Sequence, residues 1–229
     1  MVSKTSLAES IRRHRMDEVR DGLAERPDLL AVRDDRGRGW LHLACSVPGT
    51  PPAMADLLLG LGLGLDDAAF TEGTWRATPL WFAVARGQNI ALAEHLLTLG
   101  CTPNFCLFAA AWNEDRATIR LLLKHGADIE EGAERGDTPL LGAVGWSKFG
   151  PAEELLLGGA NPDAQDKQGR TALHRMLSKG SDAAHFAMFV QAGARGDIAD
   201  GEGRTAVALL RRKRDAVWKE IAAGLATAP

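Results

Sequence analysis

The sequence repeats one short pattern five times: two apolar residues, two spacer residues and a glycine. The five copies are Leu58-Leu59 with Gly62, Leu96-Leu97 with Gly100, Leu122-Leu123 with Gly126, Leu155-Leu156 with Gly159, and Phe189-Val190 with Gly193. Their glycines lie 38, 26, 33 and 34 residues apart. A period near 33 residues predicts stacked supersecondary units, none of which buries its apolar face alone. Any binding surface in such a chain is shared by several units.

A second motif opens the other half of each period. Its clearest copies are Thr78-Pro79-Leu80 with Ala83 and Thr138-Pro139-Leu140 with Ala143, and degraded copies are Leu41-His42-Leu43-Ala44, Thr171-Ala172-Leu173-His174 and Thr205-Ala206-Val207. Threonine caps helices well and proline fits a first helical turn. In the copy at Thr78 we expect a first helix that Gly87 breaks, then a second helix that ends at a left-handed Gly100.

Together these motifs resemble the ankyrin repeat, in which T-P-L-H opens a first helix and a glycine ends the second. Residues 72–104 are the best copy. The resemblance implies an all-α solenoid of stacked helix-turn-helix units with short hairpin or turn connections, forming a single domain over residues 1–229. We place about seven repeats near residues 5–33, 34–71, 72–104, 105–129, 130–163, 164–197 and 198–225, the first and last being caps.

The resemblance also assigns structural roles. His42 and His174 occupy the histidine position, which implies hydrogen bonds that tie neighbouring repeats together. The other framework positions are Thr78, Pro79, Gly100, Gly126, Thr138, Pro139, Gly159 and Gly193.

Two irregular intervals interrupt the repeat. No turn segment separates Asn104 from Phe105, so a hairpin is missing from the repeat at 105–129, whereas the stretch from Gly62 to Ala77 is longer than the pattern needs. A long loop beside a missing hairpin predicts a notch near residues 62–77 and 104–105. Insertions and deletions in surface connections also cost little free energy and often have no function. The two irregular intervals are therefore consistent either with a binding notch or with neutral variation.

The composition is that of an ordinary soluble globular protein, with 45% apolar residues, 25% charged residues and a net charge of −3. We see no signal-peptide pattern and no stretch of about 18 to 20 apolar residues, so we expect a cytoplasmic protein without a membrane partner. Heavy use of Ala, Arg, Gly and Leu without tyrosine suggests a bacterial source.

Cys45, Cys101 and Cys106 show no C-x-x-C spacing, and we expect buried, reduced thiols.

Catalytic and cofactor motifs are not found. His14, His95, His125 and His185 have no second ligand at i+3 or i+4, so we expect no metal. The glycines of Gly60-Leu61-Gly62-Leu63-Gly64 end a helix instead of opening one, which disfavours a phosphate loop. We predict a non-catalytic protein without cofactors. An enzyme with a site between repeats, invisible in sequence, is the alternative.

The basic run Arg211-Arg212-Lys213-Arg214 could be a nucleic-acid patch or a localisation signal. Because the whole chain is acidic, we favour a solvated cap and expect no nucleic-acid partner.

The resemblance places variable binding positions before T-P-L and at the end of each first helix. In this sequence those positions are Arg36, Arg38, Trp75, Arg86, Trp112, Asn113, Arg135, Asp137, Trp146, Lys167, Gln168, Arg170, Lys179, Arg212 and Lys213. Trp and Arg dominate binding hot spots. The framework does not demand a large aromatic at Trp75, Trp112 or Trp146, so we predict that these three bind a partner. Trp40, Trp81 and Trp218 fit packing positions better.

We therefore predict a protein-interaction scaffold that is monomeric when free. Basic residues flank the three tryptophans and acids fall at second-helix starts, which favours a partner protein with an acidic, partly apolar epitope. Neutralising a cognate toxin as an immunity protein is the most concrete version of this function. An adaptor or secreted effector that recruits a host protein is the alternative.

Overall fold

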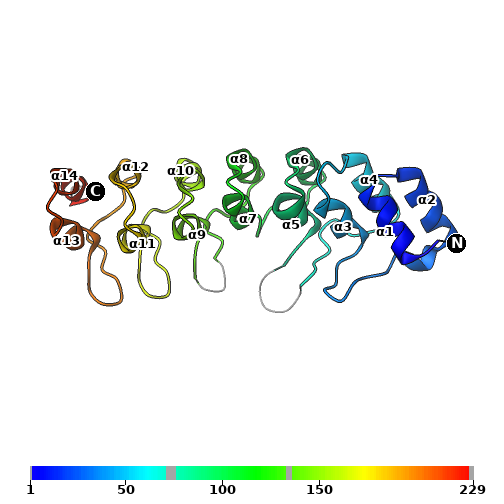
Figure 1. The fold of residues 1–229 in the computed structure, drawn as a ribbon, viewed down its shortest axis with the longest axis horizontal. Coiled ribbons are helices and arrows are strands. Elements are labelled where there is room, and N and C mark those ends of the chain that lie inside the picture. The colour runs from blue at the N-terminus through cyan, green and yellow to red at the C-terminus, as the bar shows by residue number, and fades with distance from the viewer. Residues whose placement is uncertain (1, 71–75, 133–135, 227–229) are drawn as a thin grey trace. The chain divides into compact units, whose positions relative to one another are not determined.

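A computed structural model describes residues 2–70, 76–132 and 136–226 (Figure 1). The regular secondary structure of these residues is helical, apart from two isolated antiparallel bridges, Ala69–Ala77 and Ala199–Thr205. Its elements are α1 (Lys4–Arg12), α2 (Met16–Glu25), the 3-10 turn η1 (Pro27–Leu29), α3 (Trp40–Ser46), α4 (Pro52–Gly60), α5 (Pro79–Phe82), the π-helical turn η2 (Ala83–Gly87), α6 (Ile90–Thr98), α7 (Leu107–Trp112), α8 (Arg116–Lys124), α9 (Pro139–Gly145), α10 (Phe149–Leu157), α11 (Ala172–Lys179), α12 (Ala183–Gln191), α13 (Ala206–Arg211) and α14 (Ala216–Ala226). This arrangement of paired helices confirms the predicted fold class.

The helices form two compact units. Unit 1 is Met1–Ala109 with Lys124–Ala127, and unit 2 is Ala110–Leu123 with Asp128–Pro229. In unit 1, α1, α3 and α5 pack in succession, as do α2, α4 and α6. In unit 2, α9, α11 and α13 form one row, and α10, α12 and α14 lie in the other (Figure 1). We call α1, α3, α5, α7, α9, α11 and α13 the first helices of their pairs.

Side chains at the starts of the first helices satisfy backbone groups. Thr78 Oγ1 accepts a hydrogen bond from Trp81 N, and Thr138 Oγ1 accepts one from Leu141 N, each at 3.3 Å. Since free N–H groups at a helix start need such acceptors, these threonines define where α5 and α9 begin.

The two buried histidines connect neighbouring repeats. His42 Nδ1 accepts from Gly39 N at 3.1 Å, and its Nε2 lies 2.9 Å from the carbonyl oxygen of Asp67. His174 Nε2 lies 2.9 Å from the carbonyl oxygen of Arg204. Burial lowers the pKa of His42, which favours its neutral ring. Each imidazole therefore bridges its own helix start to the next connection.

Gly87 is the last residue of η2, so the first helical segment ends there as expected. The left-handed residue is not the glycine but Gln88, which follows it with φ of 45°. A Cβ on Gly87 would lie 2.4 Å from the carbonyl oxygen of Cys45, on the preceding first helix. The glycine is needed because two backbones approach closely there, and not because of its φ angle.

Replacing Gly87 by alanine is expected to lower the free energy of unfolding by about 2 to 3 kcal/mol, because α3 or η2 must shift to admit the new methyl group. Chemical denaturation measures this loss. Gly60→Ala is the matched control: Gly60 ends α4 and its Cβ would meet nothing within 4 Å. The control should be neutral or slightly stabilising, and equal losses in both variants would contradict the contact argument.

The connections between pairs differ in length. Residues 99–106 join α6 to α7 without the longer loop that joins the other pairs from α3 onwards (Figure 1). In the 61–78 connection the Ala69–Ala77 bridge is described, but residues 71–75 lie outside the described residues. A binding notch at this point stays a prediction.

No helix in the described ranges is both long and apolar enough to span a bilayer.

Candidate functional site

Trp112 and Trp146 form an exposed aromatic pair in unit 2. Their ring centroids are 5.1 Å apart, with ring planes at 88°, the edge-to-face geometry that aromatic quadrupoles favour. Trp112 is 57% exposed and Trp146 is 36% exposed. Packing within the chain therefore leaves more than half of Trp112 and about a third of Trp146 in contact with water. Two adjoining exposed indoles are the kind of apolar patch that marks an interaction site.

The backbone holds these two rings in place. Trp146 N donates to the carbonyl oxygen of Gly142 at 2.9 Å, and Ser147 follows in the left-handed region with φ of 60°. Lys148 forms an ion pair with Glu114, so the turn after α9 is tied to the turn after α7. A partner would therefore meet a preorganised pair of indoles, which lowers the entropy cost of binding.

The pair belongs to a row of residues that we call the first-helix ends: Trp112 ends α7, Trp146 caps α9, Lys179 ends α11 and Arg212 caps α13. Since α9, α11 and α13 pack side by side, their ends follow one another along unit 2 (Figure 1). The row changes from aromatic to basic along the chain. Cations at helix C-termini interact favourably with the helix dipole, so Lys179 and Arg212 also stabilise their own helices.

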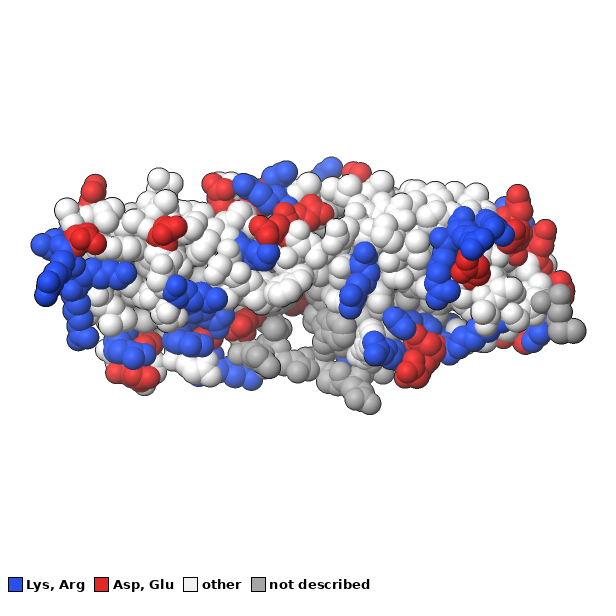
Figure 2. Space-filling view, in the orientation of Figure 1, with Lys and Arg blue, Asp and Glu red and all other residues white. Residues whose placement is uncertain are grey.

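The basic run beside Arg212 lies at the turn between α13 and α14. Lys213 Nζ sits 3.9 Å from the centre of the Trp218 ring, which in turn meets Phe186 edge-on at 5.3 Å. Trp218 thus packs onto α12. Lys and Arg gather over the α13 end of unit 2 (Figure 2), and Arg211 and Arg214 are exposed there.

Several of the predicted basic binding residues are parts of the turns before the first helices. Each of three connections contains a D-x-x-G-R motif, in which the aspartate accepts hydrogen bonds from the arginine's own N–H and from its Nε. The motifs are Asp34 to Arg38, Asp166 to Arg170 and Asp200 to Arg204, with Nε–Oδ2 distances of 2.6, 2.9 and 3.0 Å. Gly37, Gly169 and Gly203 adopt the positive φ that these turns require. Arg38 and Arg170 are therefore turn-stabilising residues whose charges are already matched.

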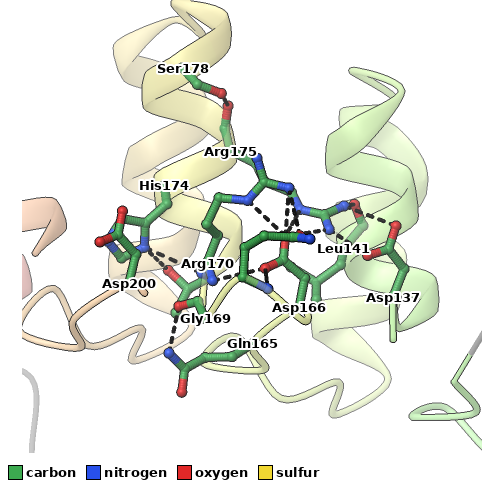
Figure 3. A network of polar contacts seen from close by, with 12 residues as sticks. Asp137, Leu141, Gln165, Asp166, Gly169, Arg170, His174, Arg175, Ser178 and Asp200 are labelled. Carbon is green, nitrogen blue, oxygen red and sulfur yellow. Dashed lines mark hydrogen bonds and ion pairs between the residues drawn. The ribbon is translucent and has the colours of Figure 1, made fainter. Parts of the chain in front are cut away.

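One arginine links this turn to its neighbour in unit 2. Arg175 of α11 donates from Nη2 to Asp166 at 2.7 Å, from Nη1 to the carbonyl oxygen of Leu141 at 3.0 Å, and to Asp137 (Figure 3). Its side chain is 11% exposed and that of Asp166 is 1% exposed. Asp137, predicted as a partner-binding residue, is thus held by Arg175 within the chain.

These contacts set the charge state of the aspartates. Burial by itself raises the pKa of Asp166, but hydrogen bonds from Arg175 and Arg170 outweigh it and lower that pKa to about 2. The hydrogen bond from Arg204 is the main reason that the pKa of Asp200 is also lowered to about 2. Both carboxylates stay ionised in the folded chain well into acid.

Asp166→Asn is expected to cost about 2 kcal/mol of stability at neutral pH, since a pKa lowered to about 2 from an unfolded value near 3.9 corresponds to that amount. This stabilising contribution is present above the unfolded pKa and is lost as the pH falls towards 2. The free energies of unfolding of wild type and variant should therefore approach each other as the pH falls from about 4 to about 2. Urea denaturation across pH measures this.

Asp163→Asn is the matched control, because burial raises the pKa of Asp163 in the same connection. Its pH dependence should have the opposite sign, with wild type gaining stability relative to the variant as the pH falls. If both variants show the same pH dependence, the network does not set the charge of Asp166.

Acidic side chains of a second helix are paired with basic side chains of its neighbour. Glu153 and Glu154 of α10 face Arg116 and Arg120 of α8, with Glu154 Oε2 lying 2.9 Å from Arg116 Nε and 2.7 Å from Arg120 Nη1. Burial alone raises the pKa of Glu154, but both arginines lower it further than burial raises it. Acidic and basic side chains are accordingly mixed over α8 and α10 (Figure 2).

The remaining predicted residues are scattered. Arg36, Arg86, Lys167 and Gln168 are exposed and Asn113 is half-buried, while Trp75 and Arg135 lie outside the described residues. Trp112 and Trp146 contact each other, and Arg170 Nη2 donates to Gln168 Oε1 at 3.3 Å. Sequence reasoning missed Asp166, Asp200 and Arg175. The three copies of D-x-x-G-R were a readable signal for the two aspartates.

The chain contains cysteines and possible metal ligands. Among the described residues, no group of three His, Cys, Asp or Glu side chains could hold a metal ion. All three cysteines are buried and free. Burial raises the pKa of Cys45, and it raises that of Cys101 to about 12, so neither sulfur is a ready nucleophile at neutral pH.

Comparisons with known proteins agree with this architecture. No family model matches the chain. The ankyrin repeat domain of Bcl-3, a member of the IkappaB protein family, aligns with a TM-score of 0.76 at 22% identity, covering 94% of this chain and 96% of that domain. The human ASB11 ankyrin repeat domain aligns at 0.73 with 21% identity over 95% and 96%, and an Acinetobacter baumannii ankyrin repeat domain at 0.67 with 22% identity over 84% and 100%.

The fold is that of ankyrin repeat domains. In sequence the chain is similar to the probable 26S proteasome regulatory subunit p28 of Saccharomyces cerevisiae, with 27% identity over 199 residues that cover 82% of this chain and 86% of the yeast protein.

Proposed function

We propose that this chain is a non-catalytic protein-interaction scaffold that binds a partner protein through the first-helix ends of unit 2. The observation that carries the proposal is the exposed, edge-to-face pair of Trp112 and Trp146. Neither indole is needed to fill the core, and both are fixed by the turns that follow their helices. The yeast relative is named as a regulatory subunit of the proteasome, a multi-protein assembly, which supports a role in protein binding.

The chemistry of the row defines the partner. An apolar surface fits over Trp112 and Trp146, and carboxylates fit near Lys179 and Arg212 further along the row. Because Arg38 and Arg170 are paired with their own aspartates, they add little net attraction for an acidic partner. The epitope is therefore a folded surface with an apolar centre and acids on one flank.

Capture experiments test the proposal. The tagged wild-type chain and a Trp112→Ala variant serve as paired baits in extracts of the source cell, with bound proteins identified by mass spectrometry. A partner retained by wild type and depleted on the variant supports the proposal. Equal recovery on both baits overturns the assignment of the site, and turnover of a substrate by the purified chain overturns the non-catalytic assignment.

The identity of the captured partner decides the more specific function. We propose toxin neutralisation as that function, in which the chain occludes a cognate toxin. A partner with toxic activity that the chain inhibits supports it. A host protein as partner favours the adaptor or secreted-effector alternative instead.

A further inference from the structure

A pocket of about 380 Å³ lies in unit 1, far along the chain from the tryptophan pair. Its walls come from α1, from the connection between η1 and α3, from α3 itself and from Phe82 of α5. We call it the α1 pocket. Its volume is at the lower end of the range for pockets that bind ligands.

The pocket combines an apolar interior with a basic rim. Val32, Trp40, Leu43 and Phe82 supply apolar wall, and Ala8 is the small residue that α1 contributes. Trp40 is fixed because its Nε1 donates to the carbonyl oxygen of Leu29 at 2.7 Å. An occupant therefore needs an apolar group that can approach α1 closely at Ala8.

Four cations and one carboxylate line the pocket, and two of the cations already form ion pairs with aspartates. Arg33 is paired with Asp67 at 2.9 Å and Arg38 with Asp34 at 2.6 Å. Lys4 and Arg12 are exposed on α1 and form no ion pair with any residue in the described ranges. The pocket thus keeps two uncompensated positive charges, both on one helix, and an acidic occupant complements them.

The spacing of these charges indicates the form of the occupant. Lys4, Ala8 and Arg12 follow one another at four-residue intervals along one face of α1, and a rise of about 1.5 Å per residue separates the two charged residues by about 12 Å. One carboxylate cannot contact both. In an extended chain, residues i and i+4 lie about 13 Å apart and point to the same side as residue i+2. Acids at i and i+4 would face Lys4 and Arg12, and an apolar residue at i+2 would face Ala8.

We propose that the α1 pocket binds an extended acidic segment of another protein, with acids at its first and fifth positions and an apolar residue at its third. This site uses residues of unit 1 that the tryptophan pair does not include, so it is an additional binding site. It can be tested with synthetic peptides and needs no knowledge of the partner of unit 2.

The probe is a capped peptide with two glutamates four positions apart, a leucine midway between them and glycine elsewhere. Titrating it into the isotope-labelled full chain should give saturable amide NMR shifts in α1 and in residues 32–46. Replacing both glutamates by glutamine should weaken binding about tenfold. Lys4→Gln with Arg12→Gln should weaken binding about tenfold, as expected for two exposed charge contacts.

Arg13→Gln with Arg20→Gln is the matched control, because it removes two exposed cations that do not line the pocket, one at the C-cap of α1 and one on α2. The control should bind like wild type. In addition, Lys4→Glu with Arg12→Glu should bind the peptide whose glutamates are replaced by lysines. Such a reversal follows from charge pairing and not from damage to the fold.

Four results overturn the proposal. These are no saturable shifts at millimolar peptide, equal binding of the glutamine peptide, equal loss in the control variant, or complete displacement of the peptide by an equal concentration of glutarate. The last result would assign the pocket to small organic acids in place of a peptide segment.

Discussion

Arg175→Met is expected to lower the free energy of unfolding by about 3 to 5 kcal/mol. The side chain of Asp166 is 1% exposed, and Arg175 binds it from α11 while also holding Asp137 and the carbonyl oxygen of Leu141. Methionine preserves much of the volume but leaves a buried carboxylate without its strongest partner. The loss in the free energy of unfolding should not be larger than this, because Arg170 and two backbone N–H groups still donate to Asp166. Urea denaturation of the full chain measures it.

Two companion variants separate the charge effect from loss of packing. Adding Asp166→Asn to Arg175→Met removes the stranded charge, so it should restore part of the stability. Arg120→Met is a control of the same chemistry, because Arg120 is 60% exposed and its partner Glu154 keeps Arg116. We expect a loss below about 1 kcal/mol there. Equal losses at Arg175 and Arg120 would contradict the assigned role of the network.

The helical pairs were predictable from sequence because each one has both a start and a stop that follow from local chemistry. Thr78 and Thr138 cap their helices. The glycines of the five-fold repeated pattern take the left-handed conformation at the ends of the second helices. The ends of most first helices could not be predicted from residue type in the same way. His14, Gln88, Glu114 and Ser147 adopt positive φ without being glycine, a conformation that residue type alone does not predict.

The candidate site was only partly predictable. Position in the repeat indicated Trp112 and Trp146, but their edge-to-face contact and exposure depend on how neighbouring helices pack. Arg38 and Arg170 carry the right charge at binding positions, yet whether an arginine faces solvent or its own aspartate is decided in three dimensions. Gly87 is similar, since its contact with Cys45 joins residues of different repeats.

Trp112→Ala and Trp146→Ala are each expected to weaken partner binding about thirtyfold, equivalent to about 2 kcal/mol for a well-packed tryptophan. Thermal melts should change little, because both indoles are exposed. Calorimetric titration with the captured partner measures the affinities. Leu157→Ala is the control: Leu157 is 75% exposed in unit 2 but belongs to α10, outside the first-helix row.

The double variant tests whether the two indoles act as one surface. Edge-to-face pairs carry about 0.5 to 1.5 kcal/mol beyond their buried area, and the rings here are 5.1 Å apart. If the partner binds the assembled pair, either single replacement already disturbs the other ring. The double variant should then lose less affinity than the sum of the single losses, while still exceeding a hundredfold. Strictly additive losses would mean that the partner contacts each tryptophan independently, and unchanged affinity would remove the pair from the binding site altogether.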